Sequence, residues 1–472
     1  MNPEKGVALT GLVPHPPLLI PRVGGKQIEE VLQTKEAVTQ LAQAVVNVKP
    51  DVIVVISPHG PVFQDGIVVN FAPTVEGDFA NFGAPEEKLQ FIVDGLFAGA
   101  VQDEAEELEV PIIPLTIDLV KRFRLTTGLD HGSLVPLYYL KKAGWHGKIV
   151  PVTMGILPSD KLYSFGIAVQ RAAQNLGRRV VVIASGDLSH RLTPDAPNGF
   201  NPRGQEFDSA ITQALEAGDV ANLLGITPEL REEAGECGYR PLVMMAGAVD
   251  GYTLEPSLLS YEGPFGVGYG VALWKTVGVD ASRRYLAGLQ QQRQTYLAQV
   301  RQQESPLVRL ARAAAELYVE QQEILSPIPD LPNNLPQQAG VFVTVKQAGN
   351  LRGCIGTFLP TQPSLAQEVI ANAIQAVSND PRFEPVDREE LAELEYSVDV
   401  LSEPREVQDL SQHDPKVHGI IVAKGERRGL LLPDLEGVDT TEEQIAIAKR
   451  KAGIRPDDDD VALAQFEVTR YQ

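Results

Sequence analysis

The sequence predicts two folded parts: a mostly parallel, doubly wound α/β sheet domain, followed by a smaller α+β domain. In the first part, short β-branched runs alternate with longer amphipathic segments, a pattern typical of βαβ units. A helical segment rich in Gln and Arg then breaks this rhythm, and a shorter mixture of strands and helices follows. A doubly wound sheet binds its ligands outside the carboxyl ends of the parallel strands, so functional residues are expected there.

The domain boundaries follow from these changes in pattern. We expect a first domain at residues 1–278, a linker helix at 279–304 and a second domain at 305–472. A chain of 472 residues agrees with two or three domains better than with a single core. Ser305 and Pro306 are residue types of an N-cap and a first helical turn, so a helix is expected to begin there.

Hydrophobic periodicity predicts where the strands and helices lie. In the first domain, buried strands are expected at 7–13, 51–57, 148–153 and 179–185, helices at 28–48, 86–108, 159–176 and 204–217, and an antiparallel edge pair at 253–262 and 268–275. In the second domain, helices are expected at 305–324 and 365–377, a proline-rich loop at 326–338, a turn at 348–350 and strands at 341–346, 351–358, 396–401 and 419–422.

Composition limits the classes of partner. The formal net charge is −21, from 41 basic and 62 acidic residues, which repels nucleic acids and anionic lipid surfaces. Nucleic acid is therefore not expected as a partner. No apolar run is long enough for a membrane helix, so a membrane is not expected as a partner either. Cys237 and Cys354 are the only cysteines. They suggest no disulfide framework, and a cytoplasmic location is therefore expected.

Four histidines of the first domain share one structural context. His15 (VPHPPL), His59 (SPHG) and His190 (SGDLSH) each follow a predicted strand, and His131 (DHGSLVPL) follows a turn and precedes a predicted helix. Because the carboxyl ends of parallel strands meet at one edge of the sheet, we expect these side chains to converge. Imidazole is a good ligand for iron, zinc or copper, and iron(II) leaves open positions for substrate and oxygen. The sequence therefore predicts a metal centre, with iron(II) preferred and zinc or copper as alternatives.

The expected roles of these residues differ. His15 and His59 are expected as metal ligands because prolines stiffen their loops. His190 and His131 are expected beside the metal, where a neutral imidazole can transfer a proton near neutral pH. Asp187 precedes His190 by three residues and could orient it or bind a substrate hydroxyl group.

Three residues are candidates for the third metal ligand. Cys237 and Glu236 lie together in GECGYRP, and Glu262 lies in SYEGPF. A carboxylate would complete the familiar set of two histidines and one carboxylate, whereas a thiolate would suit copper, zinc or iron. Cys237 precedes a helix expected to begin near Arg240, whose positive end would favour the thiolate.

The four histidine motifs resemble those of the class III extradiol ring-cleavage dioxygenases, of the protocatechuate 4,5-dioxygenase B-subunit type, over about residues 6–275. The resemblance implies a non-haem iron(II) enzyme that acts on a catecholic small molecule. It also implies that His15 and His59 bind iron, that His190 is a catalytic acid or base, and that His131 lies in the substrate pocket.

The stretch CGYRP, which begins at Cys237, resembles the CGR-P pattern of the Memo family, a relative with the same fold. This resemblance implies that the cysteine joins the two histidines around the metal, where the dioxygenases have a glutamate. It therefore favours an alternative function, a non-enzymatic module that binds a metal or a partner such as a peptide.

The second domain resembles the AMMECR domain over its whole length. The similarity rests on LRGCIGTF at 351–358, NDPRFEPVDREEL at 379–391 and the terminal FEVTRYQ. The fusion of a Memo-like domain to an AMMECR-like domain resembles one component of the AmmeMemoRadiSam system. That resemblance implies a radical S-adenosylmethionine enzyme as a partner.

Within LRGCIGTF, three adjacent residues are candidates for ligand binding. Arg352 could bind a carboxylate or phosphate through two hydrogen bonds. Gly353 leaves the backbone open to a ligand or to another segment of the chain. Cys354 could act as a nucleophile if His413 or His418 lay nearby, and the simpler interpretation is a buried cysteine in a tightly packed hairpin.

Overall fold

The structure, a computed structural model, describes residues 5–123, 125, 128–326, 331–347, 349–407, 409–410, 413–435, 438–458 and 460–472. Positions 327–330 of the predicted proline-rich loop and Ala348 of the predicted turn lie outside these residues. The chain divides into two compact units, Met1–Arg293 (unit 1) and Gln294–Gln472 (unit 2). The expected linker region contains helix α11, Leu286–Gln303, within which this division falls.

Unit 1 contains an eight-stranded sheet with the strand order β6-β3-β7-β2-β8-β1-β10-β9. The central strands β7, β2, β8 and β1 run parallel, and β10 and β9 add an antiparallel pair at one edge. The strands are β1 Gly6–Val13, β2 Val52–Ser57, β3 Ile67–Asn70, β6 Ile112–Leu115, β7 Lys148–Thr153, β8 Arg179–Ser185, β9 Tyr252–Glu262 and β10 Tyr269–Val279. The predicted mostly parallel α/β class is therefore confirmed.

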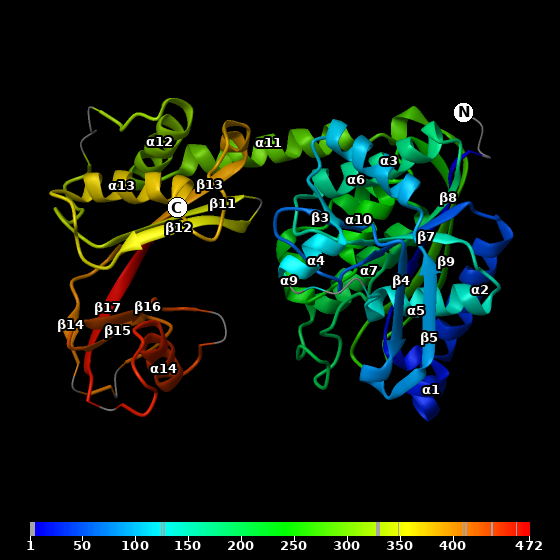
Figure 1. Ribbon diagram of the computed structural model, residues 1–472, viewed down its shortest axis with the longest axis horizontal. Helices are drawn as coiled ribbons and strands as arrows, with labels where there is room; N and C mark the ends of the chain where they lie inside the picture. Colours follow the sequence, from blue (N-terminus) through cyan, green and yellow to red (C-terminus); the bar gives the residue numbers. More distant parts are fainter. Residues whose placement is uncertain are drawn as a thin grey trace. The chain divides into compact units, whose positions relative to one another are not determined.

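Helices cover both faces of this sheet, as Figure 1 shows. The helices are α1 Pro21–Gly24, α2 Leu32–Asn47, α3 Gly95–Glu107, α4 Ile117–Phe123, α5 His131–Lys142, α6 Ser159–Asn175, α7 Arg203–Ala217, α8 Val220–Leu224, α9 Pro228–Ala234 and α10 Tyr239–Gly247. Successive residues of β2 point to opposite faces, so Val54 enters the core with α3, α6 and α10, whereas Val55 enters the core with α2 and α5. Burial on both faces explains why these strands are continuous apolar runs.

The predicted helix at 86–108 is wrong. Its first part is strand β5, Ala84–Ile92, which pairs with β4, Thr74–Phe79, and only its second part is helical, as α3. Leu89 and Phe91 are buried while Gln90 between them is exposed, a period-two pattern that marks a strand. Asp94 then starts α3, since its carboxylate accepts a hydrogen bond from the Phe97 amide at 3.2 Å.

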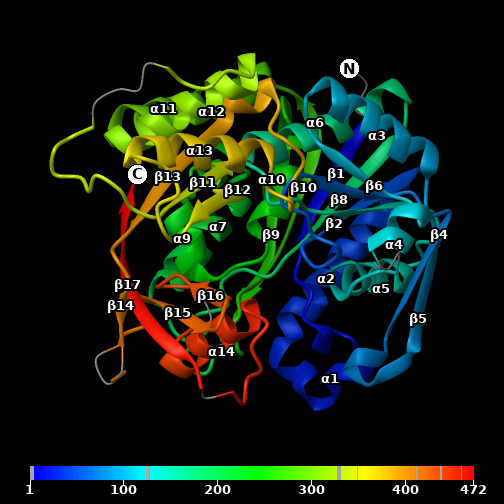
Figure 2. The same cartoon turned by 60° about the vertical axis from the view of Figure 1, so that its left-hand side comes forward.

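The hairpin β4–β5 lies at the periphery of unit 1, beside α5, in both Figure 1 and Figure 2. Its two strands are joined by a short 3-10 turn, Ala80–Phe82, which is the tip of the hairpin. The inward side chains Leu89 and Phe91 pack in the core with α5. Their outward neighbours remain exposed, so the hairpin presents a polar face to solvent.

Unit 2 is an antiparallel α+β domain, as expected from its sequence. Its seven-stranded sheet has the order β12-β11-β13-β17-β15-β16, with β14 beside β17. The elements are α12 Pro306–Gln321, β11 Val341–Gln347, β12 Asn350–Thr357, α13 Leu365–Ser378, β13 Leu394–Leu401, β14 Arg405–Glu406, β15 His418–Lys424, β16 Arg427–Leu431, α14 Thr441–Lys451 and β17 Ala462–Tyr471. Ser305 caps α12 as predicted, because its hydroxyl group accepts a hydrogen bond from the Val308 amide.

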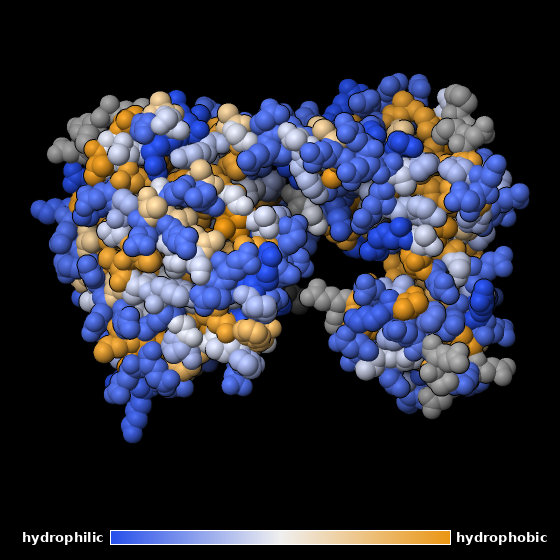
Figure 3. Space-filling view, turned by 180° about the vertical axis from the view of Figure 1, so that it is seen from behind, coloured by the Kyte–Doolittle hydropathy of each residue, from blue (hydrophilic) through white to orange (hydrophobic). Residues whose placement is uncertain are grey.

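Hydrophilic side chains predominate on the face of the molecule in Figure 3, and hydrophobic residues lie scattered among them. Within the part of the chain that the structure describes, no helix is both long enough and apolar enough to span a membrane.

Candidate metal centre

Three neighbouring parallel strands bring the predicted histidines together. Strands β2, β8 and β1 are adjacent in the sheet, and His59, His190 and His15 follow them in the loops at their carboxyl ends. His131 arrives from another direction, as the first residue of α5. The rings of His15 and His59 lie 4.6 Å apart, and His131 stacks on His59 at 4.4 Å. The expected convergence at one edge of the sheet is therefore present.

Three of the candidate ligands form one group. His15, His59 and Cys237 each offer a ligand atom, and these atoms all lie within 4.8 Å of one another. The Nε2 atoms of His15 and His59 are 2.8 Å apart, and the Cys237 Sγ atom is 3.7 Å from the His15 Nε2 atom. Metal–nitrogen bonds of about 2.1 Å and metal–sulfur bonds of about 2.3 Å give similar separations between ligands that share one ion. The three residues thus fit a single metal ion.

The hydrogen bonds of His15 determine which of its nitrogens is free. Its Nδ1 atom lies 2.9 Å from the Ser185 Oγ atom, and the Ser185 hydroxyl group donates to the Gly132 carbonyl oxygen at 2.5 Å. Because that hydroxyl proton is already used, the serine oxygen accepts from an Nδ1–H group of His15. The Nε2 atom of His15 then carries the lone pair that a metal requires.

A second set of polar contacts fixes the loop of His59. The His59 amide donates to the Ser57 Oγ atom at 3.2 Å, and the Ser57 hydroxyl group donates to Asp130 at 2.5 Å. Asp130 also caps α5, since it accepts hydrogen bonds from both the amide and the hydroxyl group of Ser133. One carboxylate therefore joins the loop of His59 to the helix that begins with His131.

Asp187 connects two of the ligands. Its carboxylate accepts a hydrogen bond of 2.8 Å from the His15 amide, and its own amide lies 3.4 Å from the Cys237 Sγ atom. These contacts make Asp187 a support for His15 and Cys237, and burial raises the pKa of its carboxyl group. That Asp187 orients His190 or binds a substrate hydroxyl group stays a prediction.

His190 lies beside the three-ligand group. Its Nε2 atom is 3.9 Å from the Cys237 Sγ atom, within reach of a molecule bound at the metal. Burial lowers the pKa of His190, although Asp187 opposes this shift. The imidazole is therefore neutral near pH 7 and able to accept a proton.

The two candidate histidine ligands, His15 and His59, are also neutral at physiological pH. Burial, together with the nearby His131, lowers the pKa of His15 to about 3. Desolvation and the adjacent His15 lower the pKa of His59 to about 4. Cys237 differs, since burial and the neighbouring Asp187 raise the pKa of its thiol, and this outweighs the expected effect of the helix start. Binding of a metal would displace the thiol proton.

Glu236 and Glu262, the other two candidates for the third ligand, form hydrogen bonds with residues outside the His15–His59–Cys237 group. The Glu236 carboxylate accepts a hydrogen bond of 2.6 Å from the Tyr239 amide at the start of α10. The Glu262 carboxylate accepts from both the amide and the hydroxyl group of Thr34. The structure brings neither carboxylate into the group of described residues that could hold a metal.

Ser57, Asp130 and Ser185 are site residues that sequence reasoning missed. Each lies within or directly beside a histidine motif, in SPHG, DHGS and SGD. A serine or aspartate at the carboxyl end of a buried parallel strand, or just before a helix, is a signal that could have identified them.

A further buried carboxylate supports the loop of His190. Asp208 of α7 accepts hydrogen bonds from the Ser189 amide at 2.8 Å and from the Tyr261 hydroxyl group at 2.7 Å. Burial raises the pKa of Asp208 to about 7. The folded protein therefore retains a proton that the unfolded chain releases at about pH 4.

This difference predicts that the contribution of Asp208 to the stability of unit 1 falls as the pH rises. Between about pH 4 and 7 this carboxyl group binds fewer protons in the unfolded state than in the folded state, so its contribution to the free energy of unfolding falls by about 2–4 kcal/mol and is constant above pH 7. The lowered pKa values of His15 and His59 contribute with the opposite sign, so the Asp208 contribution is obtained as the difference between the unchanged protein and Asp208→Asn.

Asp208→Asn does not titrate and should lose this contribution, while its oxygen can still accept from the Ser189 amide and its NH2 group can donate to the Tyr261 oxygen. The measurement is urea unfolding followed by the fluorescence of Trp145 and Trp274. The exposed control Asp103→Asn should retain the slope, and an equal slope in Asp208→Asn would contradict the prediction.

The three candidate residues of LRGCIGTF in unit 2 have contacts within the domain. The Arg352 guanidinium donates two hydrogen bonds to Glu390, at 2.6 and 2.8 Å, and others to backbone carbonyl oxygens. The Cys354 amide donates to Asp380 at 2.8 Å, and Cys354 Sγ accepts from the Thr344 hydroxyl group. These side chains stabilise the hairpin β11–β12, and the ligand-binding role remains a prediction.

Gly353 lies so close to helix α13 that there is no space for a side chain. A Cβ atom at this position would lie 2.1 Å from the Ala376 carbonyl oxygen of α13. We predict that Gly353→Ala destabilises unit 2 by about 3 kcal/mol, whereas Cys354→Ala costs about 1 kcal/mol. Both tryptophans lie in unit 1, so circular dichroism should show an earlier unfolding transition while tryptophan fluorescence keeps its midpoint. If unit 2 of Gly353→Ala unfolded at the same midpoint as that of Cys354→Ala, the close approach of Gly353 to α13 would not limit stability, and the prediction would be wrong.

The fold and the site define a class: a two-unit protein whose α/β unit carries a candidate His–His–Cys metal site. Residues 9–272 match the family "Catalytic LigB subunit of aromatic ring-opening dioxygenase", and residues 308–472 match AMMECR1. The chain therefore belongs to the LigB family, with an AMMECR1 domain fused to its LigB domain. The expected family resemblance is confirmed.

The chain is similar to several individual proteins. Protein CA_C1420 from Clostridium acetobutylicum is 38% identical over 463 residues, which cover 98% of each chain. A protein from Thermotoga maritima is 53% identical over 171 residues, or 36% of this chain and 98% of its own. The crystal structure of protein PH0010 from Pyrococcus horikoshii shares 37% identity and covers 35% of this chain and 88% of its own, with a TM-score of 0.32.

Proposed function

We propose that unit 1 is a non-haem iron(II) oxidoreductase that opens the ring of a catechol-type substrate with molecular oxygen. The observation that carries the proposal is the group His15, His59 and Cys237, with the His190 Nε2 atom 3.9 Å from the Cys237 sulfur. A storage site needs ligands alone, whereas this site also has a neutral imidazole suited to proton transfer. Membership of the LigB family agrees with this reaction.

The residues of the chain have distinct parts in this reaction. Iron(II), held by His15, His59 and Cys237, would supply positions for vicinal substrate oxygens and the electrons that activate molecular oxygen. His190 accepts the proton of a substrate hydroxyl group and returns it later in the reaction. Because Ser185 fixes the tautomer of His15, the ligand lone pair is available before substrate arrives.

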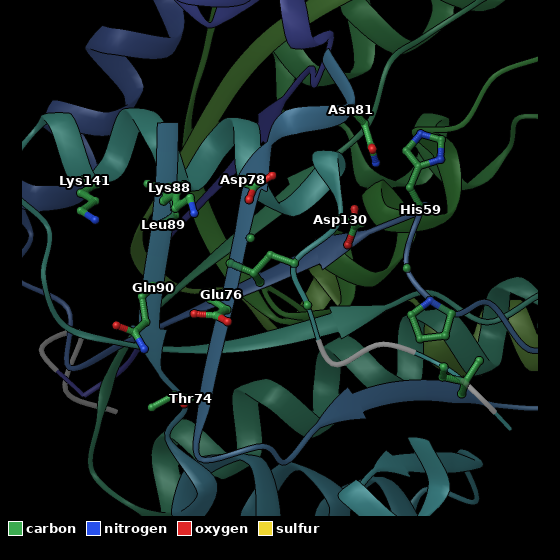
Figure 4. Close-up of a pocket in the computed structure, with 16 residues that line it drawn as sticks. His59, Thr74, Glu76, Asp78, Asn81, Lys88, Leu89, Gln90, Asp130 and Lys141 are labelled. Atoms are coloured by element: carbon green, nitrogen blue, oxygen red, sulfur yellow. The ribbon is translucent and has the colours of Figure 1, made fainter. Parts of the chain in front are cut away.

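His59 belongs both to the candidate metal site and to the lining of a neighbouring cleft. It is exposed, whereas His15 is buried, and it lines a cavity of about 1470 Å³ that runs along the β4–β5 hairpin (Figure 4). A substrate can therefore approach the metal from the side of His59. The same cleft is wide enough for a molecule larger than a single aromatic ring.

The proposal is tested by oxygen uptake. Protein loaded anaerobically with iron(II) should consume one molecule of oxygen per molecule of catechol, with a ring-opened product seen by absorbance and mass spectrometry. Zinc-loaded protein is the control and should consume none. Absence of uptake across a panel of substituted catechols would exclude ring opening.

One observation favours a second candidate function. The third ligand in the group is a thiol, and thiolates bind copper and zinc well. Unit 1 could then be a metal-binding module that serves a partner protein, without turnover of its own. Purified protein that carries stoichiometric zinc or copper and stays inactive with iron(II) would support this function in place of the first.

A further inference from the structure

Tyr269, the first residue of β10, lies at the same edge of the sheet as the metal centre. Strands β1 and β10 are antiparallel, and Leu12 of β1 pairs with Ala272 of β10. Three further residues along each chain therefore bring Tyr269 level with His15. Because this placement depends on strand pairing, no motif in the sequence indicates the tyrosine.

Backbone hydrogen bonds attach the start of β10 to the loop of His190. Gly268, directly before Tyr269, accepts a hydrogen bond of 2.8 Å from the Leu188 amide. Its own amide donates one of 2.8 Å to the Ser189 carbonyl oxygen. The backbone of Tyr269 is therefore held beside the loop that carries His190.

The Tyr269 ring lies on the face of the sheet that packs against α2 and α5. It belongs to the same buried cluster as Val13, which precedes His15 by two residues. The His15 ring lies on this face as well, because its Nδ1 atom contacts Ser185, whose hydroxyl group donates to the Gly132 carbonyl oxygen of α5. The phenol and the candidate ligand His15 therefore occupy the same side of the sheet edge.

The Tyr269 hydroxyl group lacks a hydrogen-bond partner within the part of the chain that the structure describes, although the residue is only 4% exposed. Unlike the Tyr396 hydroxyl group, it is not fully enclosed, so a small molecule can reach it. Burial and the nearby Asp187 raise the pKa of the phenol, which keeps its proton at physiological pH. Because a buried donor without a partner costs stability, this hydroxyl group is suited to an acceptor that arrives from solution.

Asp187 offers a matching acceptor. One of its carboxylate oxygens, Oδ1, accepts from the His15 amide, and the other, Oδ2, lies 4.0 Å from the His15 Nε2 atom. Among the described residues, none donates a hydrogen bond to Oδ2. The charge of Asp187 acts on the Tyr269 phenol, yet the two side chains form no direct hydrogen bond. An oxygen atom between them could accept from the phenol and donate to the carboxylate.

We propose that Tyr269 and Asp187 together bind one hydroxyl group of a molecule held at the metal centre. Tyr269 donates a hydrogen bond to the hydroxyl oxygen, and the hydroxyl group donates one to the Asp187 Oδ2 atom. The pair therefore selects a hydroxyl group, because a thiol is weak in both roles and an ether oxygen has no proton to donate. The location of the molecule rests on the proposed function, whereas the donor–acceptor pair does not.

Tyr269→Phe tests this assignment, because it removes the hydroxyl group and keeps the buried ring. The probes are catechol, which offers hydroxyl groups, and benzenethiol, which can bind a metal but has none. Both are titrated without oxygen into protein loaded with cobalt(II), whose visible absorption reports binding. We expect the variant to bind catechol about three- to tenfold more weakly than the unchanged protein, and benzenethiol within about twofold of it.

Tyr252→Phe is the matched control. Tyr252 is also a buried tyrosine of unit 1, but its hydroxyl group accepts from Gln174 and lies beside Gly6, at the opposite end of β1. Both affinities should stay unchanged in this variant. Metal content and thermal melting verify that each variant is folded.

Fluorine NMR of protein labelled with 3-fluorotyrosine gives a direct signal from the phenol. The resonance that is missing in Tyr269→Phe belongs to Tyr269, and catechol should shift it further than benzenethiol does. A tyrosine that only fills space would respond equally to the two probes.

Three outcomes would overturn the inference: unchanged catechol binding in Tyr269→Phe, equal weakening of both probes, or an equal response of the Tyr269 resonance to both. Oxygen uptake by the iron(II)-loaded protein separates this result from the proposed function. A loss specific to catechol, without uptake in the unchanged protein, removes ring opening and keeps the hydroxyl site. Full uptake by Tyr269→Phe, at unchanged affinity, keeps ring opening and removes the hydroxyl site.

Discussion

Replacement of His190 by alanine is expected to lower kcat for oxygen uptake by about 10²–10⁴, while the bound iron(II) is retained. The reason is geometric. The His190 Nε2 atom is close to the Cys237 sulfur, yet His190 is not part of the group whose atoms share one centre. The variant should thus lose proton transfer and keep metal binding.

The control for this prediction is His146→Ala, because His146 is exposed in the loop between α5 and β7. It should keep both metal and turnover. Metal content by mass spectrometry and turnover by an oxygen electrode must be measured on the same samples. Loss of iron in His190→Ala would make His190 a ligand, and full activity would remove it from the reaction.

Cys237→Ser is expected to weaken metal binding by at least about a hundredfold, and His15→Ala by a similar amount. Each substitution removes one of the three ligand atoms that, among the described residues, lie within 4.8 Å of one another. Glu236 cannot replace the lost ligand, because its carboxylate is held by the Tyr239 amide.

Glu236→Gln is the matched variant, since the amide oxygen can accept the same hydrogen bond from Tyr239. It should bind the metal within about threefold of the unchanged protein, as expected of a substitution that leaves the ligand set intact. A competition titration with a chelator gives both affinities. If Glu236→Gln lost the metal and Cys237→Ser kept it, the third ligand would be a carboxylate, and the site would be a two-histidine, one-carboxylate centre.

Much of the fold could be predicted because the buried strands are strong local signals. The segments 7–13, 148–153 and 179–185 were found to within one residue, since central parallel strands are apolar on both faces. The β4–β5 hairpin was missed because its charged outward residues, such as Lys88, resemble the polar face of a helix. As a result, the hairpin residues that line the cleft beside His59 could not be identified from the sequence.

The sequence by itself determined the family, the two-part organisation and the residues that could bind a metal, because these depend on motifs and on periodicity along the chain. Only the tertiary structure decided which of them meet. Cys237 joins His15 from 222 positions away, while its neighbour Glu236 turns to the start of α10. Adjacent side chains point in different directions, and the packing of α10 against β8 selects which one faces the histidines.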